Sequence, residues 1–529
     1  MSVGQTEWPS GLPQLGRPRA LQRVGRATLS LSQVWVLVAL VGIFIVLSLW
    51  VIRPHDFWWH IRAGQRILES GQILRVDLFS FTRAGEPWAY QSWLMEAVLY
   101  VLFQAGGLPL VVLFHALVVT SAYALLLRLN RLAGGVDLRW AALSTLAAAA
   151  VGVASWNVRP QTISFLLFAV TLYVLERCEQ NRFSGPLVGT VKPEGLSAFR
   201  SSRLLWVLPP LFALWANAHG GFVFGLTLVG SYVLARLVGW LRHGERLPQS
   251  LILVSGVSGA ATLLSPLGLG MVEYVLGFLR HPVTQTFNME FMPPSIRTLD
   301  GQLFFVFLAI LITLLAQSGY RPSRHESIRL LLFGTMALMA RRNIVWLGFA
   351  ATPTLAASLR CWVARRGPAR VETEERVGIN WALAAVVALL ALLSLPWFRP
   401  SLPLPAWRRS FVSPETPVGA VAFVRDLPQP GRVFHEVGYG SYMIWAAPEV
   451  PVFIDTRVEL YPPQQWEEYI ALSQARYDWQ GILDRYGVDT LVLDRANQAP
   501  LVQAATEDSG WEACYEDERT VVFRGAGAP

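Results

Sequence analysis

The sequence predicts a mainly α-helical protein that crosses a membrane many times and ends in a small α/β domain. Of its 529 residues, 53% are hydrophobic and only 15% are charged, whereas soluble globular proteins carry about 25% charged residues. The mean hydropathy of +0.40 reflects long apolar runs. The 21 Trp and 27 Phe exclude a disordered chain. A soluble surface for a chain of this length cannot be built from so few charges.

Windows of about 20 apolar residues predict about eleven transmembrane helices in a membrane region that covers residues 31–398. A basic tail, residues 1–30, precedes the first span. That span is too long for the apolar core of a cleaved secretory signal, so it is predicted to remain in the protein. The predicted spans lie near residues 34–51, 108–129, 139–157, 160–177, 204–218, 220–241, 250–268, 303–318, 328–341, 343–362 and 380–397.

Arginine is concentrated in alternate loops, for example at residues 182–203 and 365–376. Because cytoplasmic loops collect basic residues, the pattern predicts a cytoplasmic N-terminus. Two long segments, residues 53–107 and 265–302, then lie on the outer face, and Trp93–Gln104 is predicted to lie along the membrane interface. The net charge of +8 is therefore explained by basic residues in the cytoplasmic loops, and no nucleic-acid partner is expected.

Residues 399–529 are predicted to form a soluble α/β domain, which an odd number of spans places outside the cytoplasm. Short β-rich runs occur at residues 432–435, 450–454 and 490–493, and residues 464–473 and 479–486 have helical spacing. Thr520–Arg524 is predicted to close the sheet as an edge strand. The three cysteines are too far apart for a disulfide framework or a structural zinc site.

The first outer loop contains three candidate catalytic residues. If Asp56 begins a helix, His60 lies one turn later on the same face, where a carboxylate and an imidazole can share a metal ion or pass a proton. Glu96 lies in an apolar stretch, so it needs a polar cavity or a partner. The alternatives are that Asp56 caps a helix among interfacial tryptophans and that Glu96 faces the surface.

Further candidates lie at breaks between apolar helices. Trp215–Gly221 interrupts two helices and directs Asn217 and His219 toward an outer cavity, although a histidine bonded between helices is the alternative. Glu290 lies in the second outer loop. A predicted junction between two helices on the outer face contains Arg341, Arg342 and Asn343. Its two arginines are exceptions to the concentration of basic residues in the cytoplasmic loops.

Two neighbouring arginines at an outer junction indicate a phosphate partner, because guanidinium groups bind phosphate in a bidentate manner. Pairing with Glu96, Glu290 or lipid headgroups is the alternative. In the soluble domain, Asp455 and Arg457 follow a predicted strand, where α/β domains place ligand-binding groups. A structural ion pair is the alternative there.

These segments together resemble a group of bacterial polytopic proteins of the GT-C glycosyltransferase class. The resemblance covers most of residues 33–524. The matching segments are Asp56-Phe57-Trp58-Trp59-His60 with Gly64, Asp77–Thr82, Gln91–Glu96, Trp215–Gly221, Ser265–Gly268, Glu290 with Pro293-Pro294, Arg341-Arg342-Asn343, Val452–Arg457 and Tyr486–Asp489.

The resemblance implies an enzyme of the bacterial cytoplasmic membrane that takes a sugar from a polyprenyl-phosphate donor with inversion at the sugar carbon. It assigns Asp56 the role of activating the acceptor. Many members carry two acidic residues spaced by one, whereas His55 and Phe57 flank Asp56 here. A divalent metal ion is a candidate cofactor, with Asp56 and His60 as candidate ligands, and His60 and Glu96 would then take the place of the missing acidic residue.

The sequence therefore favours a membrane glycosyltransferase that transfers sugar to an envelope or protein acceptor on the outer face. Its expected partners are a polyprenyl-phosphate-linked sugar and membrane lipids. The alternatives are a transporter or flippase, and a non-catalytic envelope scaffold. The predicted catalytic residues are Asp56, His60 and Glu96, and the predicted substrate-binding residues are Asn217, His219, Glu290, Arg341, Arg342, Asn343, Asp455 and Arg457.

Overall fold

The computed structural model describes residues 28–134, 137–183, 203–280, 286–367, 376–476 and 478–526. Residues 1–27 of the predicted N-terminal tail lie outside these ranges, and so does most of the arginine-rich loop predicted at residues 182–203.

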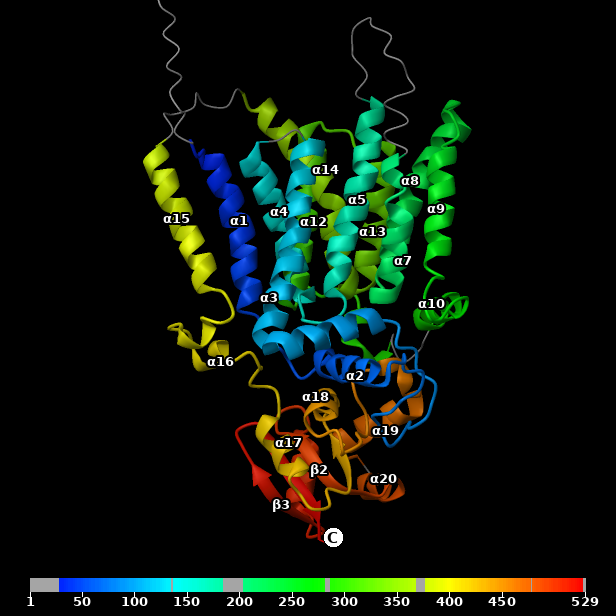
Figure 1. The fold of residues 1–529 in the computed structure, drawn as a ribbon, viewed down its shortest axis with the longest axis vertical. Helices are drawn as coiled ribbons and strands as arrows, with labels where there is room; N and C mark the ends of the chain where they lie inside the picture. Colours follow the sequence, from blue (N-terminus) through cyan, green and yellow to red (C-terminus); the bar gives the residue numbers. More distant parts are fainter. Residues whose placement is uncertain are drawn as a thin grey trace, which may run out of the picture.

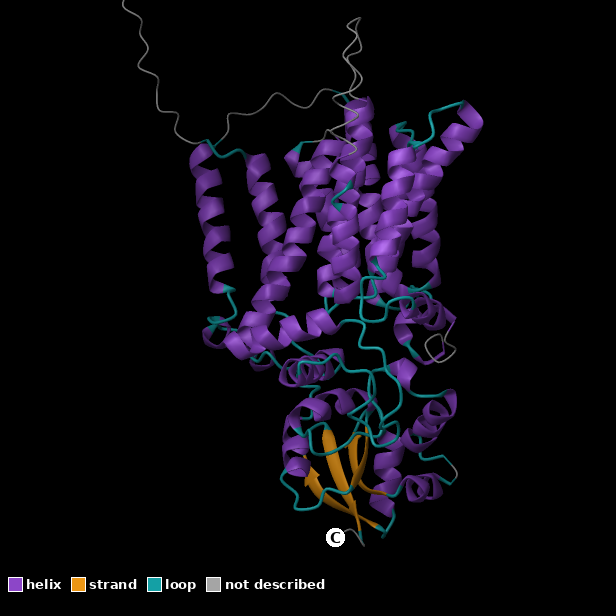
Figure 2. Ribbon diagram, turned by 45° about the vertical axis from the view of Figure 1, so that its right-hand side comes forward, coloured by secondary structure: helices purple, strands orange, loops and turns teal. Residues whose placement is uncertain are grey.

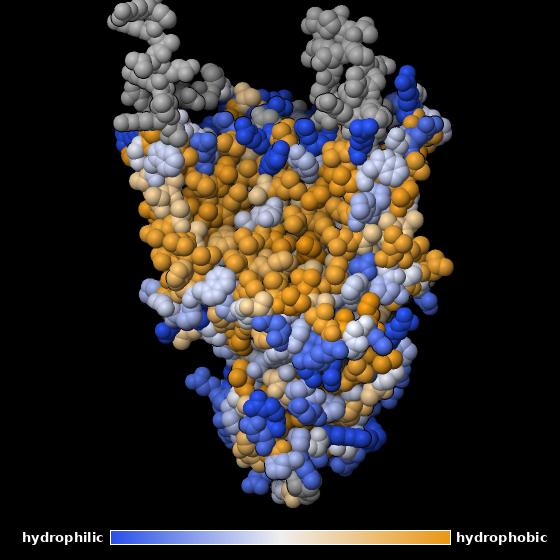
Figure 3. All heavy atoms as spheres, viewed as in Figure 1, coloured by the Kyte–Doolittle hydropathy of each residue, from blue (hydrophilic) through white to orange (hydrophobic). Residues whose placement is uncertain are grey.

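The larger part of the molecule is a bundle of upright helices (Figures 1 and 2). Each of the eleven predicted spans overlaps one helix of this bundle. On the face drawn in Figure 3 the bundle is apolar, with polar side chains at its upper and lower rims. The helices are α1 (Leu31–Ser48), α3 (Trp93–Gly134), α4 (Leu138–Gly152), α5 (Thr162–Phe183), α7 (Leu208–Ala218), α8 (Phe222–His243), α9 (Gln249–Ala261), α12 (Leu299–Ser318), α13 (Arg324–Met339), α14 (Ile344–Arg365) and α15 (Val377–Leu393).

Six of these helices in the described ranges are long and apolar enough to cross a membrane: α1, α3, α4, α8, α12 and α14. The helices α9 and α15 are apolar but shorter. The predicted polytopic, mainly α-helical architecture is therefore confirmed.

A sharp kink divides α3 into two parts. Gly107 has a φ of 63°, which favours glycine, and Pro109 follows within the helix. The part before the kink lies across the lower end of the bundle, next to α2 (Asp56–Ser70), and α10 (Gly270–Arg280) lies at the same end (Figure 1). This is the position expected of the stretch that was predicted to follow the interface.

The C-terminal part contains a four-stranded sheet in the order β1-β2-β4-β3, with β1 parallel to β2 and the other pairs antiparallel. The strands are β1 (Arg432–His435), β2 (Val488–Asp494), β3 (Trp511–Glu516) and β4 (Thr520–Gly525). The helices around them are α16 (Ala406–Arg409), α17 (Val418–Arg425), α18 (Val437–Ala446), α19 (Pro463–Ser473), α20 (Trp479–Tyr486) and α21 (Ala499–Glu507).

Two predictions about this sheet are wrong. Residues 450–454 form only isolated bridges at Val452, and β4 is an inner strand instead of an edge. The edge strand β3 was missed because nearly all of its side chains are at least partly exposed, so it lacks the apolar alternation of a half-buried strand.

The soluble domain is bonded directly to residues 53–107, the predicted first outer loop. Val452 exchanges backbone hydrogen bonds with Phe79 and Phe81, at 3.0 and 3.1 Å. Arg457 forms a buried ion pair with Asp77 of the same loop, at 2.6 Å. These contacts fix the domain against the end of the bundle where α2 lies, so that residues of both parts can share one cavity.

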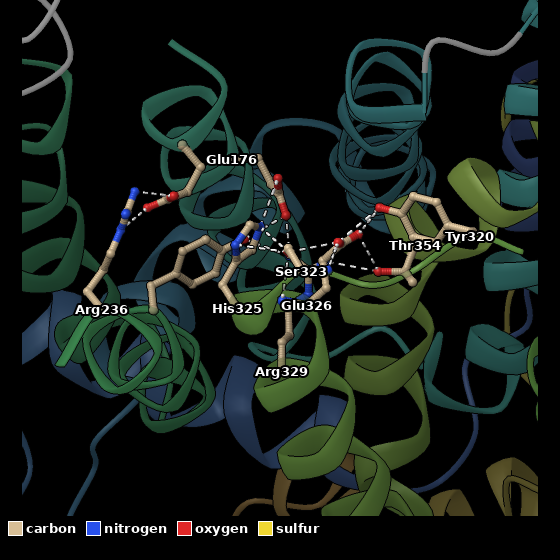
Figure 4. Close-up of polar contacts among 10 residues, drawn as sticks. Glu176, Arg236, Tyr320, Ser323, His325, Glu326, Arg329 and Thr354 are labelled. Carbon is tan, nitrogen blue, oxygen red and sulfur yellow. Dashed lines mark hydrogen bonds and ion pairs between the residues drawn. The ribbon is translucent and has the colours of Figure 1, made fainter. Parts of the chain in front are cut away.

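A buried polar cluster, here called the inner cluster, lies between α5, α8, α13 and α14 (Figure 4). It consists of Glu176, Tyr232, Glu326, Arg329 and Thr354. The Arg329 guanidinium donates to Glu176, to the Tyr232 hydroxyl at 2.6 Å and to Thr354 at 3.3 Å. Tyr232 also donates to Glu176 at 2.7 Å, and Thr354 donates to Glu326 at 2.9 Å. The cluster thereby joins four helices.

Candidate functional site

A cavity of about 610 Å³ lies between the lower end of the bundle and the soluble domain. The first outer loop, the α7–α8 break, α10 and the soluble domain all contribute to its wall. Eight of the predicted site residues line it: Asp56, His60, Glu96, His219, Glu290, Arg342, Asn343 and Arg457. Residues that are far apart in the sequence are thus brought to one cavity.

The first of these residues are positioned by the crossing of α2 and α3. The helix α2 begins at Asp56, as predicted, so His60 lies one turn later. Gly64 follows one further turn along, where a Cβ atom would lie 2.1 Å from the backbone oxygen of Glu96. Only glycine permits this close approach. As a result, His60 Nδ1 lies 2.9 Å from Glu96 Oε1 in a buried pair.

Asp56 is held by an arginine that the sequence analysis missed. Arg159, in the junction between α4 and α5, donates to Asp56 Oδ2 at 3.1 Å and to Glu290 Oε1 at 2.8 Å. Burial alone would raise the pKa of the Asp56 carboxyl, but Arg159, His60 and a hydrogen bond from Thr456 together lower it. The pKa of Glu290 is also lowered, because Arg159 and Arg342 outweigh the effect of burial. Both groups are therefore carboxylates.

Two charged side chains in the cavity lack an ion pair within the described ranges. Arg342, in the turn η3 (Arg341–Asn343), lies over the rings of Phe291 and Phe278, at 4.5 and 5.6 Å from their centroids. Glu459, in the turn η5 (Val458–Leu460) of the soluble domain, also lines the cavity and was missed by the sequence analysis. Burial raises the pKa of Glu459; nearby Arg342 opposes this rise and Asp56 adds to it.

Three predicted substrate-binding residues do not line this cavity. Arg341 makes a bidentate pair with Asp300, at 2.8 and 3.0 Å. Asn217 donates to the backbone oxygens of Ala213 and Leu264 and accepts from an indole. Asp455 is fully buried and accepts from Arg457 and from the Tyr461 hydroxyl. These three side chains use their polar atoms to connect parts of the structure.

A second cavity of about 350 Å³ adjoins the first. The residues that line both cavities are Asp56, Arg159, Asn288, Glu290, Thr456 and Val458. The second cavity is otherwise lined by side chains that include His55, Asn157 and Trp466. The Asp56–Arg159–Glu290 group therefore stands at the boundary between two chambers, each large enough for part of a ligand.

The polar side of the larger cavity is continuous with an apolar side. Phe224, Tyr274, Phe278, Met336 and Met339 contribute to its wall from α8, α10 and α13. Ligand sites commonly combine such an apolar wall with a few directed polar groups. This cavity can therefore hold a ligand that has a charged head and an apolar tail.

The candidate metal ligands do not come together as a metal-binding group. His60 is bonded to Glu96, and Asp56 is bonded to Arg159. Within the described residues, no three His, Cys, Asp or Glu side chains are grouped closely enough to hold a metal ion. The residues present at this site do not fit a divalent metal ion.

No protein-family model matches the sequence, and no curated protein matches it either. Several solved structures share the fold. An oligosaccharyltransferase, AglB from Archaeoglobus fulgidus, in complex with an inhibitory peptide and a dolichol-phosphate, aligns with a TM-score of 0.57 over 94% of this chain and 75% of that chain, at 11% identity.

Two further structures align over nearly the whole of this chain. ArnT from Cupriavidus metallidurans, bound to undecaprenyl phosphate, has a TM-score of 0.50 and 15% identity, over 92% of this chain and 97% of that chain. The arabinofuranosyltransferase AftD from Mycobacteria has a TM-score of 0.52 and 14% identity, over 95% of this chain and 40% of that chain. The chain therefore shares the fold of these proteins, in agreement with the fold class that its sequence motifs indicated.

Proposed function

We propose that this protein is a membrane glycosyltransferase that moves a sugar from a polyprenyl-phosphate donor to an envelope or protein acceptor. The observation that carries the proposal is the position of Asp56, a carboxylate at the boundary between two cavities. A transferase must hold two substrates with their reacting atoms side by side. A carboxylate at that boundary can contact the acceptor in one cavity and the sugar in the other.

The larger cavity suits the donor. Arg342 has no ion pair among the described residues, and a guanidinium is well matched to a phosphate group. The apolar wall beside it suits a prenyl chain. Glu459 and Glu290 can accept hydrogen bonds from sugar hydroxyls. Two of the solved structures that share the fold contain dolichol-phosphate and undecaprenyl phosphate, which supports a donor of this class.

In the proposed reaction an acceptor hydroxyl in the smaller cavity attacks the sugar carbon in the larger one. A bond forms between that carbon and the acceptor oxygen, while the bond from the carbon to the phosphate oxygen breaks. The hydroxyl proton passes to Asp56, and the phosphate leaves with its electron pair beside Arg342. Because attack and departure occur on opposite faces of the sugar, the configuration at the carbon is inverted.

The proposed setting is the outer face of the bacterial cytoplasmic membrane, with the N-terminus in the cytoplasm and the soluble domain outside. Basic residues such as Arg128, Arg131 and Arg242 lie near the helix ends opposite the soluble domain, which supports this orientation. A reporter fused after Pro529 should be active outside the cytoplasm. Activity on the cytoplasmic side would contradict the orientation.

The Asp56→Asn variant tests the catalytic assignment. It keeps the shape of the side chain but removes the base, so transfer of sugar should fall by about 10²–10⁴-fold. Transfer would be measured in membranes supplied with radiolabelled polyprenyl-phosphate sugars, and binding with undecaprenyl phosphate in purified protein. Asp56→Asn should still bind undecaprenyl phosphate.

The matched control is Asp300→Asn, a change of the same chemistry at a carboxylate that pairs with Arg341 outside the larger cavity. It should transfer sugar at the normal rate. Normal transfer by folded Asp56→Asn would disprove the assignment of Asp56. A transporter or scaffold would be the better explanation only if the wild-type protein transferred no sugar.

A further inference from the structure

The group at the boundary of the two cavities contains a cation that belongs to the chain itself. Arg159 donates through Nη1 to Asp56 and through Nη2 to Glu290. The two carboxylates come from segments more than 200 residues apart, in α2 and in the turn η2 (Met289–Phe291). Two carboxylates that share a site repel each other and drive one of them to take a proton. A cation between them is therefore required if both are to remain charged.

We propose that the Arg159 guanidinium takes the place of a divalent metal ion in this site, holding Asp56 and Glu290 in position as a fixed cation. The inference deepens the proposed function, because it names the cation of the same site. Its structural part, that Arg159 and not a metal ion neutralises the two carboxylates, does not depend on which reaction occurs.

The chemistry of the donor set supports this assignment. A divalent ion of the Mg²⁺ type needs carboxylate oxygens directed at it at about 2.1 Å, but oxygens of Asp56 and Glu290 are directed at one guanidinium. A metal ion beside them would also be repelled by that permanent positive charge, since arginine is not deprotonated in proteins. The Nδ1 atom of His60 is bonded to Glu96 and not to a shared ligand of Asp56 and Glu290.

A guanidinium also differs from a metal ion in how many carboxylate oxygens it leaves available to a substrate. It binds one oxygen of each carboxylate, so the other oxygen of each is free of Arg159 for a substrate contact. It is attached to the chain, so it does not need to be loaded. The burial of Arg159 is consistent with a permanent role, because only 15% of its side chain is exposed.

The test measures metal binding on the purified full-length protein, with Mn²⁺ as the probe. The thermal unfolding temperature of the wild-type protein should not change with Mn²⁺ or with EDTA, and titration calorimetry should detect no Mn²⁺ site. Arg159→Ala should unfold at a lower temperature, because two carboxylates then oppose each other. Mn²⁺ should restore several degrees in a saturable manner.

The gained Mn²⁺ effect should disappear when Arg159→Ala is combined with Glu290→Gln, which removes one ligand. Arg159→Lys is the conservative control, and it should gain no Mn²⁺ effect because it retains the charge. A saturable Mn²⁺ site in the wild-type protein that the folded Asp56→Asn variant lacks would overturn the proposal. A folded Arg159→Ala that ignores Mn²⁺ would also overturn it.

These outcomes are separate from those of the proposed function, because none of them measures sugar transfer. If Asp56→Asn transfers sugar normally but the wild-type protein binds no Mn²⁺, the catalytic role of Asp56 fails and the role of Arg159 stands. If the wild-type protein binds Mn²⁺ at Asp56 and transfers sugar, the proposed function stands and the role of Arg159 fails. Where transfer is measured, EDTA should leave its rate unchanged.

Discussion

The cavity and the inner cluster both hold buried charges, but they use them differently. In the inner cluster, Glu176 and Glu326 each accept several hydrogen bonds, and Arg329 donates to three partners (Figure 4). In the cavity, Arg342 and Glu459 have no ion pair among the described residues. Both regions thus bury charged groups, but only in the cavity do two charged side chains without an ion pair face a space that a ligand can enter.

The positions of the two regions agree with this difference. Glu176 lies 14 residues into α5, which is about 20 Å from the cavity end of that helix at 1.5 Å per residue. Neither of the two cavities is lined by a residue of the inner cluster. We infer that the inner cluster stabilises the bundle and that the cavity gives up stability to bind a ligand, a trade that is common at functional sites.

The largest expected effect is the loss of stability when the inner cluster is broken. Arg329→Met removes the arginine partner of the buried Glu176 carboxylate, and breaking a buried ion pair typically costs about 3–5 kcal/mol. The variant should unfold at a clearly lower temperature when followed by tryptophan fluorescence in detergent. Combining it with Glu176→Leu should recover most of the loss, because apolar side chains can replace a buried ion pair. A double variant as unstable as Arg329→Met would mean that the pair is not the source of the effect.

The second prediction separates two adjacent arginines. Arg342→Ala should weaken the binding of undecaprenyl phosphate by roughly 10- to 100-fold, since a hydrogen bond to a charged group is worth about 1.5–3 kcal/mol. Its unfolding temperature should hardly change. Arg341→Ala is the matched control, and it should bind normally but lose a little stability through the partly buried pair with Asp300. Equal loss of binding in both variants would contradict the assignment.

The sequence could not separate these two arginines because it gives only their order. In a 3₁₀ turn successive side chains point about 120° apart, since there are 3.0 residues per turn. In η3 this geometry leads Arg341 to Asp300 and Arg342 into the cavity. The spans themselves were predictable, because each crossing needs a long apolar run. The polar breaks at Asp56 and His219 were predictable for the same reason, as polar residues stand out against such runs.

The two missed residues had signals of different strength. Arg159 lies at a helix junction on the cavity side of the bundle, like Arg341 and Arg342, so the distribution of basic residues could have identified it. As a single arginine beside Pro160 it did not stand out. Glu459 had no usable signal, because charged residues are common in a soluble domain. Its role depends on how the domain is placed against the bundle, which only tertiary structure reveals.

The smallest expected effect concerns Glu459, whose ionised form is expected to lower the stability of the folded protein. Burial raises its pKa in the folded protein, whereas the usual value for glutamate is about 4.3. The protonated form is therefore the one that favours folding. Its contribution is fully present below about pH 4.3 and is lost as the pH rises through the folded-state value. At neutral pH the wild-type protein carries the cost of an ionised group that Glu459→Gln lacks.

Glu459→Gln should therefore unfold at a slightly higher temperature than the wild-type protein at pH 7.5, and the difference should vanish as the pH falls to about 4. Glu512→Gln, at an exposed position on β3, is the control and should show no such trend. If Glu459→Gln were less stable than the wild-type protein at neutral pH, Glu459 would be held by a favourable partner. The cavity would then resemble the inner cluster, and the distinction between the two regions would fail at this residue.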